Sequence, residues 1–278
     1  MVQLSDVLSA IDARKATLDA LRPLSSATAG SLRTALALEW TYHSNAIEGN
    51  TLTLRETRVV LEGITIGGKS LRDHLEAINH RDAILLVEDL VARSEQIDEW
   101  NIRGIHQLVL RTIDPVEAGR YRRENVLIAG ASFQPPSHVL IPERMQDLVK
   151  WHQTEADAQL LHPIARAAEL HTRFVEIHPF VDGNGRTGRL LLNLDLMRAG
   201  FPPAVVRKED RAAYYDALDK ACITRNYEDI TRLVADGVIR TLDLYLETVT
   251  GQKPTPLIAA SVPNESDDEG HFGHPGDG

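Results

Sequence analysis

The sequence predicts an almost entirely α-helical bundle, with one small β-hairpin as the exception. Apolar residues recur at helical spacing through most of the 278 residues, and Gly, Pro and capping residues divide them into separate segments. Residues 124–142, ENVLIAGASFQPPSHVLIP, break this pattern, because two short β-prone runs flank a turn rich in Gly, Ser and Pro. The expected fold class is therefore all-α, with a hairpin at about residues 124–141.

Capping residues mark the helices expected in the first part of the chain. A first helix is expected within residues 1–30, and its apolar stripe needs a packing partner. The second spans about Ser31 to Glu48, before a Gly-Asn stop. Thr53–Glu56 reads TLRE, a capping box that opens a third helix, and a fourth begins near Ser70.

The remaining helices are expected to complete one domain over residues 31–250. Their predicted ranges are Glu99–Ile113, Pro142–Ala158, Pro163–Ile177, Arg186–Ala199, Glu209–Ile223 and Tyr227–Thr250. Residues 251–278 are rich in Gly, Pro, Ser and acidic residues, so they cannot bury enough apolar surface to fold. We expect a disordered acidic tail there.

Charge and cysteine content argue against several classes of function. The net charge is −10, whereas nucleic-acid binders usually gather Lys and Arg on one face, and no basic recognition helix is present. No apolar run is long enough to span a membrane, and the N-terminus lacks a signal-peptide pattern. Cys222 is the only cysteine, which excludes an intrachain disulfide. We therefore expect a cytoplasmic protein with no nucleic-acid or membrane partner.

The stretch HPFVDGNGRTGR, residues 178–189, combines a base, a carboxylate and an anion cradle. Its glycines can expose backbone N–H groups just before a helical pattern, which is typical of a phosphate site at a helix N-terminus. Asp182 would repel phosphate unless a cation lay between them, and Mg²⁺ binds both carboxylate and phosphate oxygens. His178 lies close enough to act as general base. The stretch predicts attack on a Mg²⁺-bound nucleotide phosphate, although the P-loop pattern GxxxxGK[ST] is absent.

Other histidines and arginines have simpler explanations. A metal site from His171, Glu176 and His178 is disfavoured, because the spacing does not place both histidines on one helical face and HExxH is missing. His162 and His171 are expected as helix-start or core residues. A solvated face near the hairpin is expected for the arginine run, Arg120, Arg122 and Arg123.

The twelve residues of HPFVDGNGRTGR match the signature HPFx[DE]GNGRxxR of Fic proteins at every fixed position. The chain resembles that family over roughly Trp40 to Val249, including SNAIEGNTLTLRE, DPVEAGRYR and RLLLNLDLMRAGFPPAVVRKEDRAAYYDAL. This resemblance implies a Fic-type helical bundle whose hairpin, the flap, covers the active site. It also implies transfer of AMP from ATP to a Ser, Thr or Tyr hydroxyl of an unidentified target protein.

The resemblance assigns roles to individual residues. His178 would deprotonate the acceptor hydroxyl, Asp182 would hold Mg²⁺, and Phe180 would anchor the loop in the core. The residues implied in nucleotide binding are Gly183, Asn184, Gly185, Arg186, Thr187, Gly188, Arg189, Tyr214, Tyr215, Ile128, Ala129, Gly130 and Ala131. The two tyrosines have an alternative as packing aromatics.

A second motif implies self-inhibition. SNAIEG, residues 44–49, fits the pattern [ST]xxxE[GN] that forms an inhibitory helix in Fic proteins. The resemblance implies that Glu48 pairs with Arg189 and occupies the place of the ATP γ-phosphate. Such a charge-assisted contact is worth about 1.5–3 kcal/mol, which gives strong but incomplete restraint. An exposed carboxylate at a helix end is the alternative.

Several functions stay open beside a self-inhibited adenylyltransferase. A bifunctional enzyme would also remove AMP, with Glu48 orienting the attacking water. A Fic scaffold that binds a partner without turnover is a third candidate. Relatives commonly dimerise, so the N-terminal stripe is also a candidate surface for a homodimer.

Overall fold

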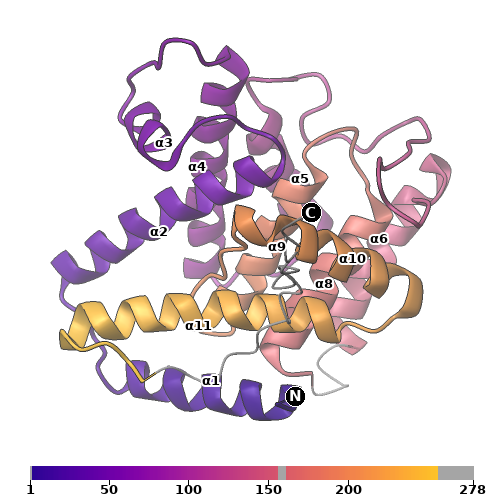
Figure 1. Cartoon of the computed structure of the whole chain (residues 1–278). Coiled ribbons are helices and arrows are strands. Elements are labelled where there is room, and N and C mark those ends of the chain that lie inside the picture. The colour runs from indigo at the N-terminus through magenta and orange to yellow at the C-terminus, as the bar shows by residue number, and fades with distance from the viewer. Residues whose placement is uncertain (1, 156–160, 256–278) are drawn as a thin grey trace, which may run out of the picture.

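The chain folds as a helical bundle in the computed structural model, which describes residues 2–155 and 161–255 (Figure 1). Within those ranges every regular element is a helix and no β-strand is present, so the predicted all-α class is confirmed. The expected disordered tail lies mostly outside the described residues.

The helices follow the predicted segments closely. Their bounds are α1 (Leu4–Asp19), α2 (Ser26–Ile47), α3 (Leu54–Leu61), α4 (Leu71–Ala92), α5 (Glu99–Leu110), η1 (His138–Leu140), α6 (Ile141–Lys150), η2 (Trp151–Glu155), α8 (Pro163–Ile177), α9 (Asn184–Arg198), η3 (Lys208–Asp210), α10 (Arg211–Thr224) and α11 (Glu228–Thr250). The capping box before α3 is confirmed: Thr53 Oγ1 accepts from the Glu56 N–H at 3.2 Å, and Glu56 Oε2 accepts from the Thr53 N–H at 2.7 Å.

Two predicted boundaries are wrong. Helix α2 begins at Ser26 rather than near Ser31, because the Ser25 hydroxyl caps it by accepting from the Thr28 N–H. The segment predicted as one helix over Pro142–Ala158 is α-helical from Ile141 to Lys150, after which η2 forms a π-helical turn to Glu155. Residues 156–158 lie outside the described part of the chain. The sequence periodicity does not distinguish these two helix types.

Helices α8 and α9 form the centre of the bundle (Figure 1). One apolar cluster packs them against α4, α5 and α6, and a second packs them against α1, α10 and α11. Helix α9 is buried nearly all round, since its apolar residues do not form a single stripe: they are Leu190, Leu191, Leu192, Leu194 and Leu196. The two helices therefore fix the loop that joins them from both sides.

The apolar stripe of the first helix is covered within the same chain. Val7, Ile11 and Leu18 are buried in the second cluster, and α1 runs beside α11 along the lower edge of the view (Figure 1). The stripe that was a candidate surface for a homodimer thus already has its partner.

The predicted hairpin does not form. Residues 124–137, called the flap loop below, contain no strand, and their tightest feature is a turn in which the Ala131 N–H donates to Ile128 O at 3.2 Å. Pro135 and Pro136 lack N–H groups, so the second half of the loop cannot complete a hydrogen-bond ladder. Side chains hold the loop instead: His138 donates its N–H to Asn125 Oδ1 at 2.9 Å.

Among the described residues, none of the helices has both the length and the apolar composition required to cross a bilayer.

Substitution of Gly188 by Ala is expected to destabilise the fold by about 1–3 kcal/mol, because overpacking forces neighbours apart. A Cβ at Gly188 would lie 2.9 Å from His171 Nδ1 and 3.2 Å from Phe174 Cδ1, both on α8. Gly30 on α2 is the matched control, since a Cβ there meets nothing within 4 Å. Gly30→Ala is expected to preserve or raise the free energy of unfolding, measured for both variants by urea denaturation. Equal effects of the two substitutions would contradict the tight α8–α9 contact.

Candidate active site

The loop between α8 and α9 is short and closed by its own residues. Helix α8 ends where His178 adopts a left-handed conformation (φ 49°) before Pro179, and α9 starts after Gly183 (φ 78°). The Asn184 side chain accepts from the Phe180 N–H at 3.0 Å and donates to Phe180 O at 2.8 Å. The loop backbone is therefore held in one shape.

A histidine that sequence reasoning missed supports this loop. His106 on α5 stacks on the buried ring of Phe180, with centroids 3.5 Å apart and planes 2° apart. Its Nδ1 accepts from the Gly119 N–H at 2.9 Å, so Nε2 carries the proton and donates to Asp182 O, also at 2.9 Å. Burial lowers the pKa of His106 to about 4, which keeps the ring neutral. No local motif announces this role, because every partner is distant in sequence.

A cavity of about 440 Å³ brings together residues from four distant segments. The predicted residues that line it are Glu48, Ile128, Ala129, Gly130, Ala131, His178, Gly185, Arg189, Tyr214 and Tyr215. Residues that were not predicted complete the wall: Phe133, Val175, Arg211, Leu218 and Asp219. Glu48 of the SNAIEG motif, the flap loop, the candidate base and the tyrosine pair thus share one site.

The other predicted site residues lie around this cavity rather than in its wall. Asn184 braces its own loop, Gly188 faces α8, and Thr187 is fully buried. The remaining three lie at the N-terminus of α9 and just before it: Asp182, Gly183 and Arg186.

Glu48 and Arg189 form an ion pair across the cavity. Arg189 Nη2 donates to Glu48 Oε1 at 2.8 Å and to Ser44 O at 2.7 Å, while Nε donates to Ser44 Oγ at 3.0 Å. The Arg189 residue is only 3% exposed. Burial disfavours its charge, yet the Glu48 carboxylate contributes to holding the pKa of Arg189 above its usual value. A side chain at Gly185 would overlap Glu48 Oε1, so this close approach requires glycine.

The two tyrosines differ in environment. Tyr214 is buried, and its hydroxyl lies 2.7 Å from Nε2 of His171, which is a core histidine as expected. Tyr215 is 36% exposed, and the guanidinium of Arg211 lies over its ring at 4.9 Å. Tyr214 therefore combines packing with a place in the cavity wall, while Tyr215 offers a partly open aromatic surface.

His178 is neutral in this setting. Burial lowers its pKa to about 4, and the nearby charge of Arg122 acts in the same direction. A ring without a proton on one nitrogen is what a general base requires.

Asp182 lies in a network of opposite charges at the start of α9. Its Oδ2 pairs with Arg72 Nη2 at 2.6 Å and its Oδ1 with Arg186 Nη2 at 3.2 Å. Glu76 Oε1 bridges the same two arginines at 3.0 and 3.2 Å. Burial opposes the charge of Asp182, but Arg186, the Gly183 N–H and Arg72 hold its pKa below the usual range. This carboxylate is therefore charged and already surrounded by cations.

The Asp182 site fits Mg²⁺ only if the substrate supplies further ligands. No group of three or more His, Cys, Asp or Glu side chains is arranged to bind a metal in the described part of the chain. Mg²⁺ is commonly held by one or two carboxylates together with phosphate oxygens and water. Asp182, whose side chain is 45% exposed, is a suitable protein ligand of that kind.

The prediction of a solvated face for all three arginines before the flap loop is wrong for Arg122. That residue is 2% exposed, and its side chain donates only to backbone carbonyls in the described residues. The reason is that the segment turns inward at Arg122, where its N–H also donates to Pro179 O at 2.9 Å.

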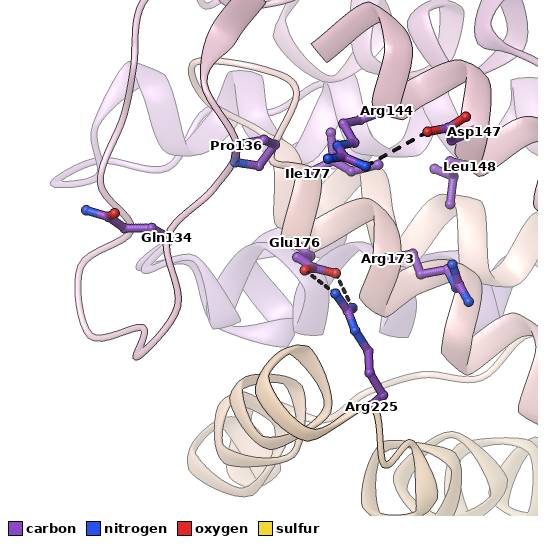
Figure 2. Close-up of a pocket in the computed structure, with 9 residues that line it drawn as sticks. All are labelled: Gln134, Pro136, Arg144, Asp147, Leu148, Arg173, Glu176, Ile177 and Arg225. Carbon is purple, nitrogen blue, oxygen red and sulfur yellow. Dashed lines mark hydrogen bonds and ion pairs between the residues drawn. The ribbon is translucent and has the colours of Figure 1, made fainter. Parts of the chain in front are cut away.

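A second cavity, of about 470 Å³, adjoins the far end of the flap loop (Figure 2). Gln134 and Pro136 line it, together with residues of α6 and α8 and the arginine after α10. Figure 2 shows one ion pair in its wall, in which Arg225 donates to both carboxylate oxygens of Glu176. The flap loop thus contributes to the walls of two cavities.

Comparisons with known sequences identify related proteins. Residues 96–196 match the Fic/DOC family. The chain is 44% identical over 214 residues to a protein named "Protein adenylyltransferase Fic" from Nematostella vectensis, covering 75% of this chain and 48% of that protein. A protein of the same name from Drosophila willistoni is 38% identical over 240 residues, which cover 86% of this chain and 47% of the relative. The chain therefore spans about half the length of the curated relatives it matches.

Solved structures with a similar fold cover the chain more fully. A Fic-1 fragment (residues 134–508) from C. elegans superposes with a TM-score of 0.80 at 34% identity, covering 89% of this chain and 73% of that one. A Fic domain-containing signaling protein from Bacteroides thetaiotaomicron gives a TM-score of 0.80 at 30% identity, covering 89% and 98% of the two chains.

Stability is expected to fall as the pH drops from about 6.5 toward 4. Burial lowers the pKa of His106 to about 4 and that of His171 to about 3. The unfolded chain takes up protons near pH 6.5, before the folded chain does, so both histidines stabilise the fold fully above that pH. Each should remove about 1.5 kcal/mol of unfolding free energy between pH 6.5 and 5.

Urea unfolding at pH 7, 6.5 and 5 measures this loss. His171→Gln is the control, because removal of one titrating group should reduce the loss by roughly 1.5 kcal/mol. A free energy of unfolding that is the same at pH 6.5 and pH 5 would show that these rings are not buried in the neutral form.

Proposed function

Since the chain belongs to the Fic/DOC family, we propose that it is a protein adenylyltransferase that transfers AMP from ATP to a Ser, Thr or Tyr hydroxyl of a target protein. The observation that carries this proposal is the cavity of about 440 Å³ that joins His178, the first turn of α9 and the Glu48–Arg189 pair. It combines a base, a phosphate site and a regulatory carboxylate.

The start of α9 is proposed to bind the ATP phosphates. The first backbone N–H groups of a helix have no partner within it, and the helix dipole favours negative charge there. Gly185 lines the cavity at this point and leaves the backbone uncovered. Arg189 supplies a fixed positive charge one turn later. Tyr215, Tyr214 and the turn Ile128–Ala131 line the same cavity, and this partly apolar part of its wall suits the adenosine moiety.

His178 is proposed to accept the proton of the acceptor hydroxyl. As that oxygen bonds to the α-phosphorus, the bond to the β-phosphate bridging oxygen breaks and pyrophosphate leaves. The low pKa of His178 keeps its ring available for the proton at neutral pH. The closed loop fixes the backbone that carries the ring, which lowers the entropic cost of positioning the base for the reaction.

Asp182 is proposed to hold Mg²⁺ together with the phosphates. The metal would supply charge neutralisation for the phosphate oxygens. Arg72 and Arg186, which pair with Asp182 in the structure, keep the carboxylate ionised and oriented toward the start of α9. These residues therefore maintain a ligand of the correct charge.

Glu48 is proposed to inhibit the enzyme by occupying the Arg189 side of the phosphate site. The 2.8 Å contact and the close approach to Gly185 support this proposal, because a γ-phosphate near Arg189 would meet the carboxylate. A bifunctional enzyme that also removes AMP is the alternative, favoured by the position of Glu48 and His178 in the same cavity. Loss of AMP from a purified modified protein over time distinguishes the two.

The cytoplasm is the compartment proposed for this activity. The single cysteine, Cys222, is buried, and a protein without disulfides suits a reducing environment.

Glu48→Gly is expected to raise automodification from α-labelled ATP at least about tenfold. This factor corresponds to about 1.5 kcal/mol, the lower value for the free energy of a charge-assisted contact. Arg189→Ala should not activate, because it removes the inhibitory contact and the proposed γ-phosphate ligand together. The double variant should therefore resemble Arg189→Ala, as expected of coupled partners. Affinity for ADP, measured by calorimetry, should be similar in the parent and in Glu48→Gly. Unchanged turnover in Glu48→Gly would remove the inhibitory role.

His178→Ala in the Glu48→Gly background is expected to abolish AMP transfer while ATP affinity stays within about threefold, because general-base catalysis contributes typically 10²–10⁴-fold and acts only as the hydroxyl attacks. Gel assays with α-labelled ATP and calorimetry measure the two quantities. Transfer near the rate of Glu48→Gly alone would exclude His178 as the base.

A further inference from the structure

We propose that Arg122 is a positioning residue that ties the segment of the catalytic base to both ends of the flap loop. The inference rests on the proposed function. It concerns how the catalytic base and the flap loop keep their relative position. No sequence motif or implied role assigns this task to Arg122.

The three side-chain nitrogens of Arg122 each donate to a different backbone carbonyl. Nε donates to His178 O at 2.8 Å, Nη1 to Glu124 O at 2.8 Å, and Nη2 to Pro136 O at 2.6 Å. One planar guanidinium thus joins the base, the start of the flap loop and its end.

The main chain of Arg122 strengthens the same connection. Its N–H donates to Pro179 O at 2.9 Å, so two consecutive carbonyls of the base segment are bound to one residue. His178 has a left-handed backbone, which is uncommon for a residue with a side chain. The hydrogen bonds to the carbonyls of His178 and Pro179 fix the backbone where that conformation is needed.

Burial and charge indicate that this arrangement is specific. Arg122 is 2% exposed, and burial lowers its pKa. No Asp or Glu lies within ion-pair distance of it among the residues that the structure describes, so the carbonyl oxygens are its compensation. Burying a charge in this way is costly unless every donor is satisfied. Lysine cannot reproduce the contacts, because its single ammonium lacks the planar fork of a guanidinium.

The flap loop has few other attachments. The two ends of the loop are joined by Asn125, whose Oδ1 accepts from the His138 N–H at 2.9 Å. The tip of the loop is held by Asp219, whose Oδ1 accepts from the Ser132 N–H at 2.7 Å. Neither bond reaches the loop that carries His178. Because the flap loop has no β-ladder, Arg122 is the residue that fixes its position relative to the catalytic base.

The consequence for catalysis is geometric. The flap loop and His178 line the same cavity, so a hydroxyl that enters beside the flap loop reaches His178 only when loop and base keep a fixed separation. Misplacement by about 1 Å can cost on the order of 100-fold in rate. Loss of the tether should therefore lower kcat more than it weakens nucleotide binding, since the phosphate site at α9 is fixed by other contacts, although the flap turn Ile128–Ala131 also lines the cavity.

The test uses Arg122→Lys in the active Glu48→Gly background, with α-labelled ATP and automodification as readout. We expect kcat to fall at least tenfold, while KM for ATP and the affinity for MgADP, to which the flap turn Ile128–Ala131 contributes, change by less than about threefold, consistent with a positioning error rather than lost binding. Hydrogen exchange of the flap-loop amides should accelerate. Arg103→Lys is the matched control, because Arg103 Nε also donates to a loop carbonyl, Gly119 O at 2.8 Å, without contact to flap loop or base. It should keep kcat within about twofold, since its loop carbonyl lies outside the base segment.

Each outcome decides between structural and positioning roles. Equal kcat for Arg122→Lys and Arg103→Lys would overturn the proposal, as would a loss confined to KM for ATP. Arg122→Gln, neutral with one amide donor, is the second variant if Arg122→Lys does not fold, and it should show the same loss in kcat. If Glu48→Gly protein itself transfers no AMP, the proposed function fails, and the catalytic part of this inference fails with it. The rate of hydrogen exchange at the flap-loop amides in Arg122→Lys then tests only whether Arg122 tethers the loop.

Discussion

The contact between α8 and α9 is the interaction on which the rest of the structure depends. The two helices approach closely because Gly188 presents no side chain toward His171 and Phe174. Both apolar clusters build outward from this pair, so the five residues that separate His178 from Asn184 have little freedom. A loop of that length, held at both ends by buried helices, places a base and a helix N-terminus at fixed distance. The chemistry proposed for the site needs that fixed distance.

Three arginines near the site are buried, and each is compensated differently. Arg189 is paired with a carboxylate from α2, Arg186 with Asp182 and Glu76, and Arg122 with carbonyl oxygens alone. Only the first pairing involves a carboxylate whose place we propose that a phosphate takes. The other two stabilise the backbone and the acidic ligand. A buried cation therefore serves regulation, orientation or loop tethering according to the partner that neutralises it.

Local signals in the sequence predicted what local physics decides. The capping box at Thr53, the helix over Pro163–Ile177 and the glycine loop before α9 depend on residues within a few positions, and the structure agrees with them. The Fic signature also identified His178, Gly185 and Arg189 in the wall of the main cavity, and resemblance outside the signature identified Glu48, the flap turn and the tyrosine pair. The prediction of a flap hairpin is wrong because Pro135 and Pro136, which lack N–H groups, outweigh the β-propensity of the residues around them.

Long-range partners account for the residues that were missed. His106 and Arg122 act through backbone groups 76 and 56 positions away, and no spacing rule connects them. Thr187 and Gly188 stand at unspecified positions of the signature and face the core, and Asn184, at a fixed position, braces its own loop, because a helix buried nearly all round directs part of any motif inward. A signature therefore identifies a segment more reliably than the face of the segment that touches substrate.

The position of Glu48 determines the kind of switch that the site can contain. The carboxylate extends from the C-terminal cap of α2, whose last turn buries Ser44, Asn45 and Ile47. Under the proposed inhibition no separate tail or domain has to detach, because rotation of the Glu48 side chain alone would uncover Arg189 and would leave the bond from Arg189 to Ser44 O in place. Side-chain rotations are faster than domain movements by several orders of magnitude. The resting activity would thus be set by a rotamer population, which nearby packing can tune continuously rather than in an all-or-none step.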